Sequence, residues 1–187
     1  SFPTRRSSDL TLLRFATEQM AYWRKRSKVE FNIRQVELEG AVLNGAIDKI
    51  EFLDNGTIRI IDYKTGNWTS KRTARPNEEN PLGGDYYRQL LFYKILLEQS
   101  FIFGEPVSAG AISWVENVKK GNFRTDEIFF TPEDTSWMRQ LILETWGNIQ
   151  ARKFDTGCGK PDCSWCKMHQ DRSFFEVPES EEVELDD

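Results

Sequence analysis

The sequence lacks any run of about 18 apolar residues, the length that a membrane-spanning helix requires. No signal peptide is visible either, because the first ten residues, Ser1–Leu10, are polar and basic and contain no apolar stretch. From these two absences we expect a cytoplasmic protein with no membrane partner.

Cysteine is scarce and confined to one short segment. The chain has three cysteines, all between residues 158 and 166. An odd number at such close spacing excludes the disulfide framework of a small secreted domain. These cysteines are expected to be either metal ligands or reduced thiols.

Excess negative charge is confined to one end of the chain. The net charge is −5, but the tail Glu176–Asp187 holds seven of the 30 acidic residues and no basic one. The rest of the chain is therefore nearly neutral, which leaves room for a local basic surface that binds nucleic acid. A terminal run of like charge is typical of a disordered, solvated segment.

The length of 187 residues and the apolar content of 39% fit one domain with one core and short appendages. We expect a disordered or foreign leader over residues 1–10, with the true beginning of the domain missing. The remaining parts are a core over residues 11–155, a cysteine-rich segment over residues 156–175 and a disordered acidic tail over residues 176–187.

Hydrophobic periodicity predicts the order of helices and strands. The expected helices cover Thr11–Lys28, Asp85 to about Gln99, and Thr135–Lys153 with Thr131 as N-cap. The expected strands are Glu30–Leu38, Ala41–Phe52, Thr57–Tyr63 and Ala109–Val115, and the alternation of the first strand slips by one residue after Ile33. A tight turn at Asn55-Gly56 joins the second and third strands into an antiparallel meander. This order predicts an α/β or α+β fold with a mixed sheet flanked by helices.

Two acids and a lysine are expected to converge on this meander. Asp62 and Lys64 are two residues apart on one strand and so share a face of the sheet. Asp48 lies on the preceding strand of the hairpin, which can bring its carboxylate beside Asp62. Two carboxylates suit Mg²⁺ or Mn²⁺, and Lys64 can orient a water or stabilise a charged transition state. An isolated Asp-x-Lys is usually only an exposed pair. Three features together favour a functional site here: the Asp one hairpin upstream, the apolar run that leads into Asp62, and the Thr-Gly directly after Lys64.

Three motifs in this order resemble the RecB-like nucleases of the PD-(D/E)XK superfamily. They are Gly45-x-x-Asp48-x-Ile50, Ile61-Asp62-Tyr63-Lys64-Thr65-Gly66 and Gln89-x-x-x-Tyr93, and the resemblance is good from Glu30 to Ser100. It implies a restriction-endonuclease-like core and a Mg²⁺- or Mn²⁺-dependent deoxyribonuclease that cuts as an exonuclease. It also implies a role in DNA repair and recombination, as the C-terminal nuclease domain of a helicase or in complex with one.

The resemblance also implies roles for individual residues. Asp48 and Asp62 bind the metal with the main-chain carbonyl of Tyr63, Lys64 is catalytic, and Gln89 and Tyr93 contact the site or the DNA. The alternative is a catalytically silent module of a helicase–nuclease complex that only binds DNA or docks a partner.

Two features depart from the family pattern. No histidine lies on a helix before the sheet, since the chain has only His169, and Glu18, Glu30 and Glu37 are the candidate replacements. The segment Cys158-x4-Cys163-x2-Cys166-x2-His169 also differs from the four-cysteine pattern of relatives with an iron–sulfur cluster. It leaves three interpretations open: a Cys3His Zn²⁺ site, an incomplete cluster site, and no metal.

Candidate DNA contacts surround the end of the third strand. The basic candidates are Lys71, Arg72, Arg75 and Arg88, and Trp68 is a candidate for stacking on an unpaired base. The alternative is that the basic residues are merely solvated and that Trp68 covers an edge of the core.

Overall fold

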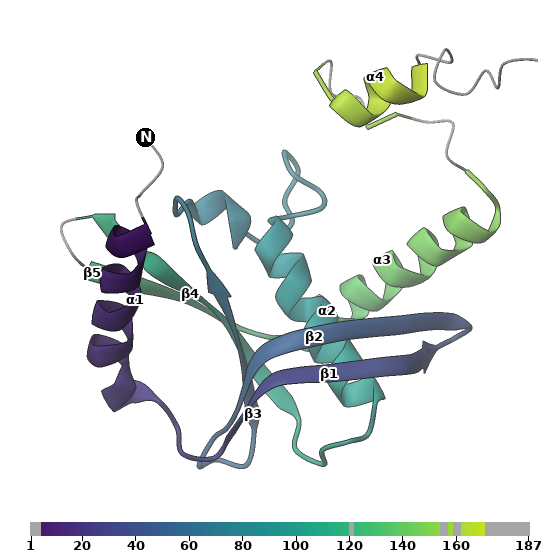
Figure 1. The fold of residues 1–187 in the computed structure, drawn as a ribbon. Helices are drawn as coiled ribbons and strands as arrows, with labels where there is room; N and C mark the ends of the chain where they lie inside the picture. Colours follow the sequence, from purple (N-terminus) through teal and green to yellow (C-terminus); the bar gives the residue numbers. More distant parts are fainter. Residues whose placement is uncertain (1–4, 120–121, 154–156, 159–161, 171–187) are drawn as a thin grey trace, which may run out of the picture. The chain divides into compact units, whose positions relative to one another are not determined.

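The computed structural model describes residues 5–119, 122–153, 157–158 and 162–170 (Figure 1). The chain divides into two compact units, Ser1–Trp146 and Gly147–Asp187. No helix in the described part of the chain is long and apolar enough to cross a membrane. The acidic tail, residues 176–187, lies outside the described residues.

A five-stranded mixed sheet forms the centre of the first unit. Its strands are β1 (Ser27–Leu38), β2 (Ala41–Phe52), β3 (Ile58–Lys64), β4 (Val107–Lys119) and β5 (Asn122–Phe129). They lie in sequence order, and all neighbours are antiparallel except β3 and β4, which are parallel. The predicted mixed sheet flanked by helices is thus confirmed.

Local sequence signals account for the meander. Gly56 has a φ of 76° in the turn between β2 and β3, where Leu53 N–H donates to Thr57 O at 2.8 Å. Only glycine adopts such a φ at no steric cost. The predicted slip in β1 is a β-bulge: the register shifts between Ile33 and Val36, and Gln35 has a φ of 57°. The bulge keeps the apolar residues on both sides of it facing the core.

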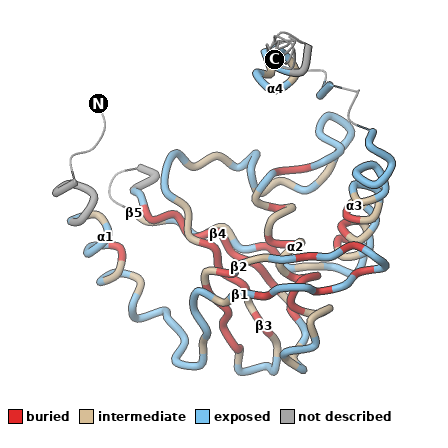
Figure 2. Tube along the Cα trace, turned by 45° about the vertical axis from the view of Figure 1, so that its right-hand side comes forward, coloured by how far each residue is buried: buried red, intermediate tan, exposed pale blue. Residues whose placement is uncertain are grey.

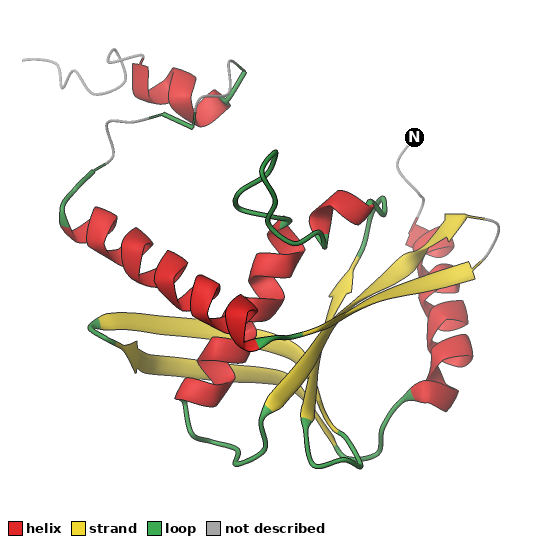
Figure 3. Ribbon diagram, turned by 180° about the vertical axis from the view of Figure 1, so that it is seen from behind, coloured by secondary structure: helices red, strands yellow, loops and turns green. Residues whose placement is uncertain are grey.

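Helices cover both faces of the sheet (Figures 1 and 3). Helix α2 (Asp85–Gln99) makes the crossover that parallel strands require and lies on one face with α3 (Pro132–Gln150). Helix α1 (Arg5–Gln19), with the short 3-10 turn η1 (Met20–Tyr22), lies on the other face. Figure 2 shows that buried residues follow the sheet strands and the inner side of α2.

The structure corrects the first predicted helix at both ends. Helix α1 begins at Arg5, so residues 5–10 are helical rather than unstructured, and it ends at Gln19 rather than Lys28. The basic residues that suggested a last helical turn instead anchor an extended connection, because Arg24 pairs with Asp54 and Arg26 pairs with Glu105.

Strand β5 was not predicted. Charged residues, which include Arg124, Asp126 and Glu127, occupy both faces of the strand, as is usual for a strand at the edge of a sheet. The hydrophobic alternation is therefore too weak to reveal the strand.

The end of the chain contains two further helical features. Helix α3 begins at Pro132, where Thr131 Oγ1 accepts a hydrogen bond from Asp134 N–H at 3.2 Å, which confirms the predicted N-cap. In the second unit, a short helix, α4 (Ser164–Gln170), contains Cys166 and begins directly after Cys163.

Candidate active site

Asp48 and Asp62 lie on adjacent strands at the same end of the sheet. The β2–β3 register pairs Lys49 with Ile61, which places Asp48 opposite Asp62 and on the same face. Asp48 Oδ2 accepts a hydrogen bond of 2.9 Å from Tyr63 N–H. The predicted approach of these two carboxylates is therefore present in the structure.

Asp62 is almost completely buried, with an exposed fraction of 2%. Its Oδ2 forms an ion pair with Lys64 Nζ at 2.6 Å, and its Oδ1 accepts a hydrogen bond from Gln89 Nε2 at 3.0 Å. Oδ2 has no hydrogen bond of good geometry within the described residues. Burial raises the pKa of Asp62 and the nearby Asp48 adds to this, while Lys64 opposes it.

Helix α2 supplies the third motif. Gln89 and Tyr93 share a helix face, and Gln89 Nε2 lies 2.8 Å from Tyr93 Oη as well as donating to Asp62. Burial raises the pKa of the Tyr93 hydroxyl, which therefore remains protonated at neutral pH. The five residues expected from the three motifs thus form one connected group.

Tyr86 belongs to the same site but was not singled out from the sequence. Lys64 Nζ lies 5.0 Å from the centre of its ring and Arg72 Cζ lies 4.9 Å from it. Arg72 also donates a hydrogen bond to the Tyr86 hydroxyl. The available signal was its position three residues before Gln89, which puts both side chains on one helix face.

The predicted DNA contacts separate into two groups. Lys71 and Arg72 lie in the 3-10 turn η2 (Ser70–Arg72) and are exposed beside the site. Arg75 instead makes an ion pair with Asp134 at 2.9 Å and donates to Phe129 O. Arg88 donates to Leu82 O and Gly83 O, so it braces the loop before α2. We retain only Lys71 and Arg72 as candidates for phosphate contacts.

Trp68 is half-buried and packs against the core. Its Nε1–H donates to Asp126 Oδ2 at 2.7 Å, and the guanidinium of Arg124 stacks 3.9 Å from its ring. Because both its edge and its face are engaged, the structure favours the alternative in which Trp68 covers an edge of the core.

The candidate replacements for the missing histidine lie apart from the two aspartates or point to solvent. Glu18 pairs with Arg14 on the exposed side of α1. Glu37 pairs with Val42 near the far end of the β1–β2 hairpin. Glu30 is the nearest of the three to Asp48, because its two neighbours on β1 pair with Lys49 and Ile47 on β2. Its side chain, however, is exposed.

The three cysteines come together in the second unit. The Sγ atoms of Cys158, Cys163 and Cys166 all lie within 4.8 Å of one another. Hydrogen bonds from Cys166 N–H and from the two neighbouring thiols lower the pKa of Cys163 to about 7. His169 lies on α4, but its side chain is outside the described residues, so its predicted part in this site stays a prediction.

The donor atoms at the aspartate site fit a divalent cation. Carboxylate oxygens are the hard ligands that Mg²⁺ and Mn²⁺ prefer. Asp62 Oδ2 is buried without a well-aligned hydrogen-bond donor, so a cation there would satisfy an atom that the protein leaves partly unsatisfied. A second positive charge would also offset the burial that raises the pKa of Asp62.

Comparison with known proteins gives an independent result. Residues 4–170 match the family model of the PD-(D/E)XK nuclease superfamily. A search of curated proteins finds no significant match.

Solved structures show a likeness of fold. The structure of a "Putative exonuclease" from Eubacterium rectale covers 86% of this chain, with a TM-score of 0.52 and 14% identity. The structure of SSO0001 covers 72% of this chain at 17% identity, and its TM-score of 0.41 is too low to support an argument. This chain spans 58% and 57% of the length of these two structures, respectively.

Proposed function

Because this chain belongs to the PD-(D/E)XK nuclease superfamily, we propose that it is a Mg²⁺- or Mn²⁺-dependent deoxyribonuclease of the RecB-like branch. The observation that carries the proposal is the connected group of Asp48, Asp62, Lys64 and Gln89 at one end of the sheet. Within a nuclease superfamily, two carboxylates and a lysine at the end of adjacent strands suit phosphodiester hydrolysis.

In this proposal, Asp48, Asp62 and the main-chain carbonyl of Tyr63 hold the cation. When bound, the cation supplies positive charge at the scissile phosphate and lowers the pKa of a water. Lys64 releases its ion pair with Asp62 and places its ammonium against the attacking water or the phosphate oxygens. Gln89 holds the Asp62 carboxylate in place, and Tyr93 keeps the Gln89 amide oriented.

Lys71 and Arg72 are proposed to bind the DNA backbone next to this site. Their charges are exposed, whereas the guanidinium groups of Arg75 and Arg88 are bound by Asp134 and by main-chain carbonyls of the protein. Phosphate contacts of this kind position the strand and carry no sequence information. The proposed substrate is therefore DNA of any sequence, degraded from its ends.

We also propose that the nuclease works in the cytoplasm within, or in complex with, a DNA repair or recombination helicase. Support comes from the order of the three motifs, which is typical of RecB-like modules. A direct check is whether an added UvrD-type helicase and ATP accelerate degradation of duplex DNA. No acceleration, with single strands degraded normally, would oppose the association.

The cysteine group is proposed to hold a metal ion of its own, either Zn²⁺ or the iron of a cluster. Three thiols within 4.8 Å of one another, one with a pKa of about 7, support this proposal. Metal analysis and visible absorption of freshly purified protein distinguish the two, because only an iron–sulfur cluster is coloured. Protein that binds neither metal, with all three thiols freely alkylated, would overturn it.

The decisive experiment measures cleavage of labelled single- and double-stranded DNA with Mg²⁺, with Mn²⁺ and with EDTA. We expect cleavage only with the metals, and its loss in Lys64→Ala. Lys153→Ala is the matched control, since Lys153 is an exposed lysine just after the end of α3. Circular DNA distinguishes attack at ends from internal cleavage, because an exonuclease leaves a closed circle intact.

Circular dichroism shows whether each variant folds. A folded wild type that binds DNA without cutting it under any condition would overturn the enzyme proposal in favour of a silent binding module. Cleavage that persists unchanged in Lys64→Ala would overturn the assigned centre.

A further inference from the structure

A cavity of about 400 Å³ lies on the face of the sheet opposite Asp62. Ile61 and Tyr63 on β3 line it, and they alternate with Asp62 and Lys64, whose side chains point to the α2 face. The small side chains of β4 residues at its floor leave the space open. Its volume falls within the range of small-molecule sites. The cavity is therefore separate from the proposed active site, although both use the same strand.

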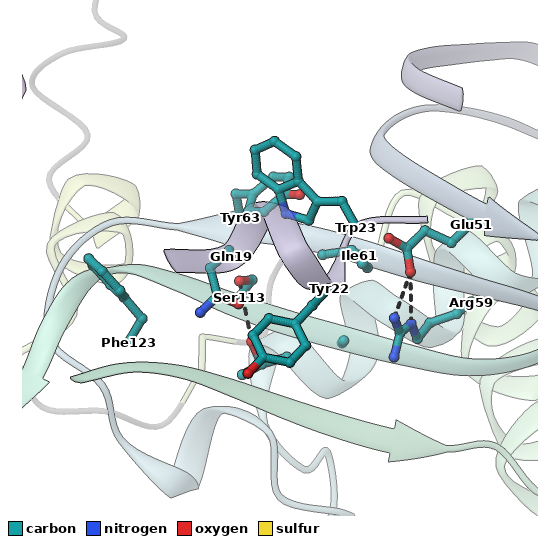
Figure 4. A pocket seen from close by; sticks show the side chains of 11 residues that line it. Gln19, Tyr22, Trp23, Glu51, Arg59, Ile61, Tyr63, Ser113 and Phe123 are labelled. Carbon is teal, nitrogen blue, oxygen red and sulfur yellow. Dashed lines mark hydrogen bonds and ion pairs between the residues drawn. The ribbon is translucent and has the colours of Figure 1, made fainter. Parts of the chain in front are cut away.

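Aromatic side chains form the walls of this cavity (Figure 4). They are Tyr22 and Trp23, which follow α1, Tyr63 from β3 and Phe123 from β5. Phe15 packs edge-on against Tyr63 and Phe123, with ring centres 6.0 and 5.0 Å apart, and so fixes two of the walls. Trp23 remains 40% exposed, which leaves part of its ring available for stacking.

Polar groups with unused hydrogen-bonding capacity also face the cavity. The side-chain amide of Gln19 makes no hydrogen bond within the described residues. Glu51 is 1% exposed, and its Oε1 has no hydrogen bond of good geometry, although Lys49 Nζ forms an ion pair with it at 2.7 Å. Arg59 contacts the other oxygen of Glu51 at 2.6 Å. Such groups favour a ligand with a hydrogen-bonding edge over a hydrocarbon ring.

The charges around the cavity balance. Lys49 and Arg59 are offset by Glu51 and Glu127 in one network of ion pairs. Burial would raise the pKa of Glu51, but hydrogen bonds from Lys49 and Arg59 outweigh burial and lower it. Glu51 therefore stays ionised at neutral pH. A site with no net charge suits a neutral, planar ligand rather than a phosphate.

We propose that this cavity binds a nucleobase. The base stacks on Trp23 and its neighbouring rings, and its polar edge meets the Gln19 amide and the Glu51–Arg59 pair. In Figure 4, Glu51 and Arg59 close one end of the cavity and Phe123 lies at the other. The base comes either from a free nucleoside or from an unpaired position of a DNA strand. This inference goes beyond the proposed cleavage and does not depend on it.

The test is titration of the whole chain with deoxyadenosine, deoxyguanosine, deoxycytidine and thymidine, followed by calorimetry or ligand-observed NMR. Nucleosides contain no phosphodiester bond, so cleavage cannot interfere. We expect saturable binding of at least one nucleoside with a dissociation constant on the order of 1 mM. Trp23→Ala should weaken it about tenfold or more through loss of stacking. Gln19→Ala should weaken it less and change the preference among bases.

Trp165→Ala is the matched control, since Trp165 is an exposed tryptophan of α4 that does not line the cavity. It should leave binding unchanged, as should Lys64→Ala, which separates this inference from the proposed function. Absence of saturable binding, or equal binding by Trp23→Ala, would overturn the inference.

The source of the base is tested by competition. An oligonucleotide that displaces the nucleoside, when an abasic strand of equal length does not, assigns the cavity to unpaired bases of DNA. If other free nucleosides displace the bound nucleoside and the oligonucleotide does not, the cavity is assigned to free nucleosides. An abasic strand that displaces the nucleoside as well as the oligonucleotide does would overturn recognition of the base.

Discussion

Gln89 on α2 donates a hydrogen bond of 3.0 Å to Asp62 Oδ1 at the end of β3, although the two residues are 27 positions apart. The bond joins the crossover helix to the strand that carries the buried carboxylate. It therefore fixes the direction in which the second oxygen of Asp62 points.

Removal of this amide should slow the proposed cleavage without unfolding the protein. We expect Gln89→Ala to lower the cleavage rate about 10- to 100-fold and to raise the Mg²⁺ concentration needed, as happens when a hydrogen-bond partner of a metal-binding carboxylate is lost. Steady-state kinetics at several Mg²⁺ concentrations provide the measurement. Gln140→Ala is the control, since Gln140 is an exposed glutamine whose amide donates to Glu144. Equal rates in both variants would show that Gln89 has no positioning role.

The two groups of basic residues should respond differently to truncation. Lys71→Ala should weaken DNA binding in EDTA about three- to tenfold and reduce the slope of log affinity against log salt by about 1. Arg75→Ala should leave that slope unchanged and instead lower the free energy of unfolding by about 1–3 kcal/mol, because Asp134 loses its partner. Filter binding over a salt series and urea denaturation measure the two effects. A lower salt slope in Arg75→Ala would instead show that Arg75 contacts the DNA.

Asp134 should make stability depend on acid pH. Burial would raise its pKa, but hydrogen bonds from Arg75, Tyr87 and Thr131 N–H outweigh burial and lower the pKa to about 2, from an ordinary value of 3.8. The folded carboxylate therefore contributes stability that is fully present above about pH 4 and is lost as pH falls toward 2. The free energy of unfolding, measured between pH 2 and 5, should depend less steeply on pH in Asp134→Asn than in wild type. An equally steep loss of stability in the variant would show that other carboxylates cause the acid dependence.

Gly45, the first residue of the Gly-x-x-Asp motif, should be needed for packing. A Cβ added there would lie 2.6 Å from Leu96 Cδ2 of α2, which requires the helix or the leucine to move. Gly45→Ala should cost about 1–3 kcal/mol of unfolding free energy and should also disturb the placement of Gln89. Gly104→Ala, where a Cβ meets nothing within 4 Å, is the control. Similar unfolding free energies in both variants would contradict the close approach.

The sequence alone was sufficient for the parts of the molecule that depend on local pattern. The meander, the β-bulge, the extent of α2 and the convergence of Asp48, Asp62 and Lys64 follow from alternation, turn chemistry and strand spacing. The end of α1 and strand β5 could not be predicted in this way. Their positions depend on contacts distant in sequence, such as Arg24 with Asp54 and Arg59 with Glu127.

The same limit applies to individual site residues. Charge alone could not distinguish Arg75 and Arg88, whose guanidinium groups bind other groups of the protein, from Lys71, which is exposed. The sequence around Trp68 likewise does not indicate that Asp126 bonds its indole N–H or that Arg124 stacks on its ring. Such assignments require the partner of each side chain, and the partners of Trp68 lie on β5, which the pattern did not reveal.

The connectivity of the sheet has a consequence for the order of folding. Asp48 and Asp62 are joined by a short hairpin, whereas Gln89 reaches Asp62 only through the crossover that pairs β3 with β4. Hairpins close with little loss of chain entropy, and parallel pairing across a long connection closes slowly. We expect Asp48 and Asp62 to come together early in folding, while their charges still repel each other. The hydrogen bond from Gln89 should form late. Φ-values near zero at Leu90 and near one at Ile50 would support this sequence of events, and the reverse would oppose it.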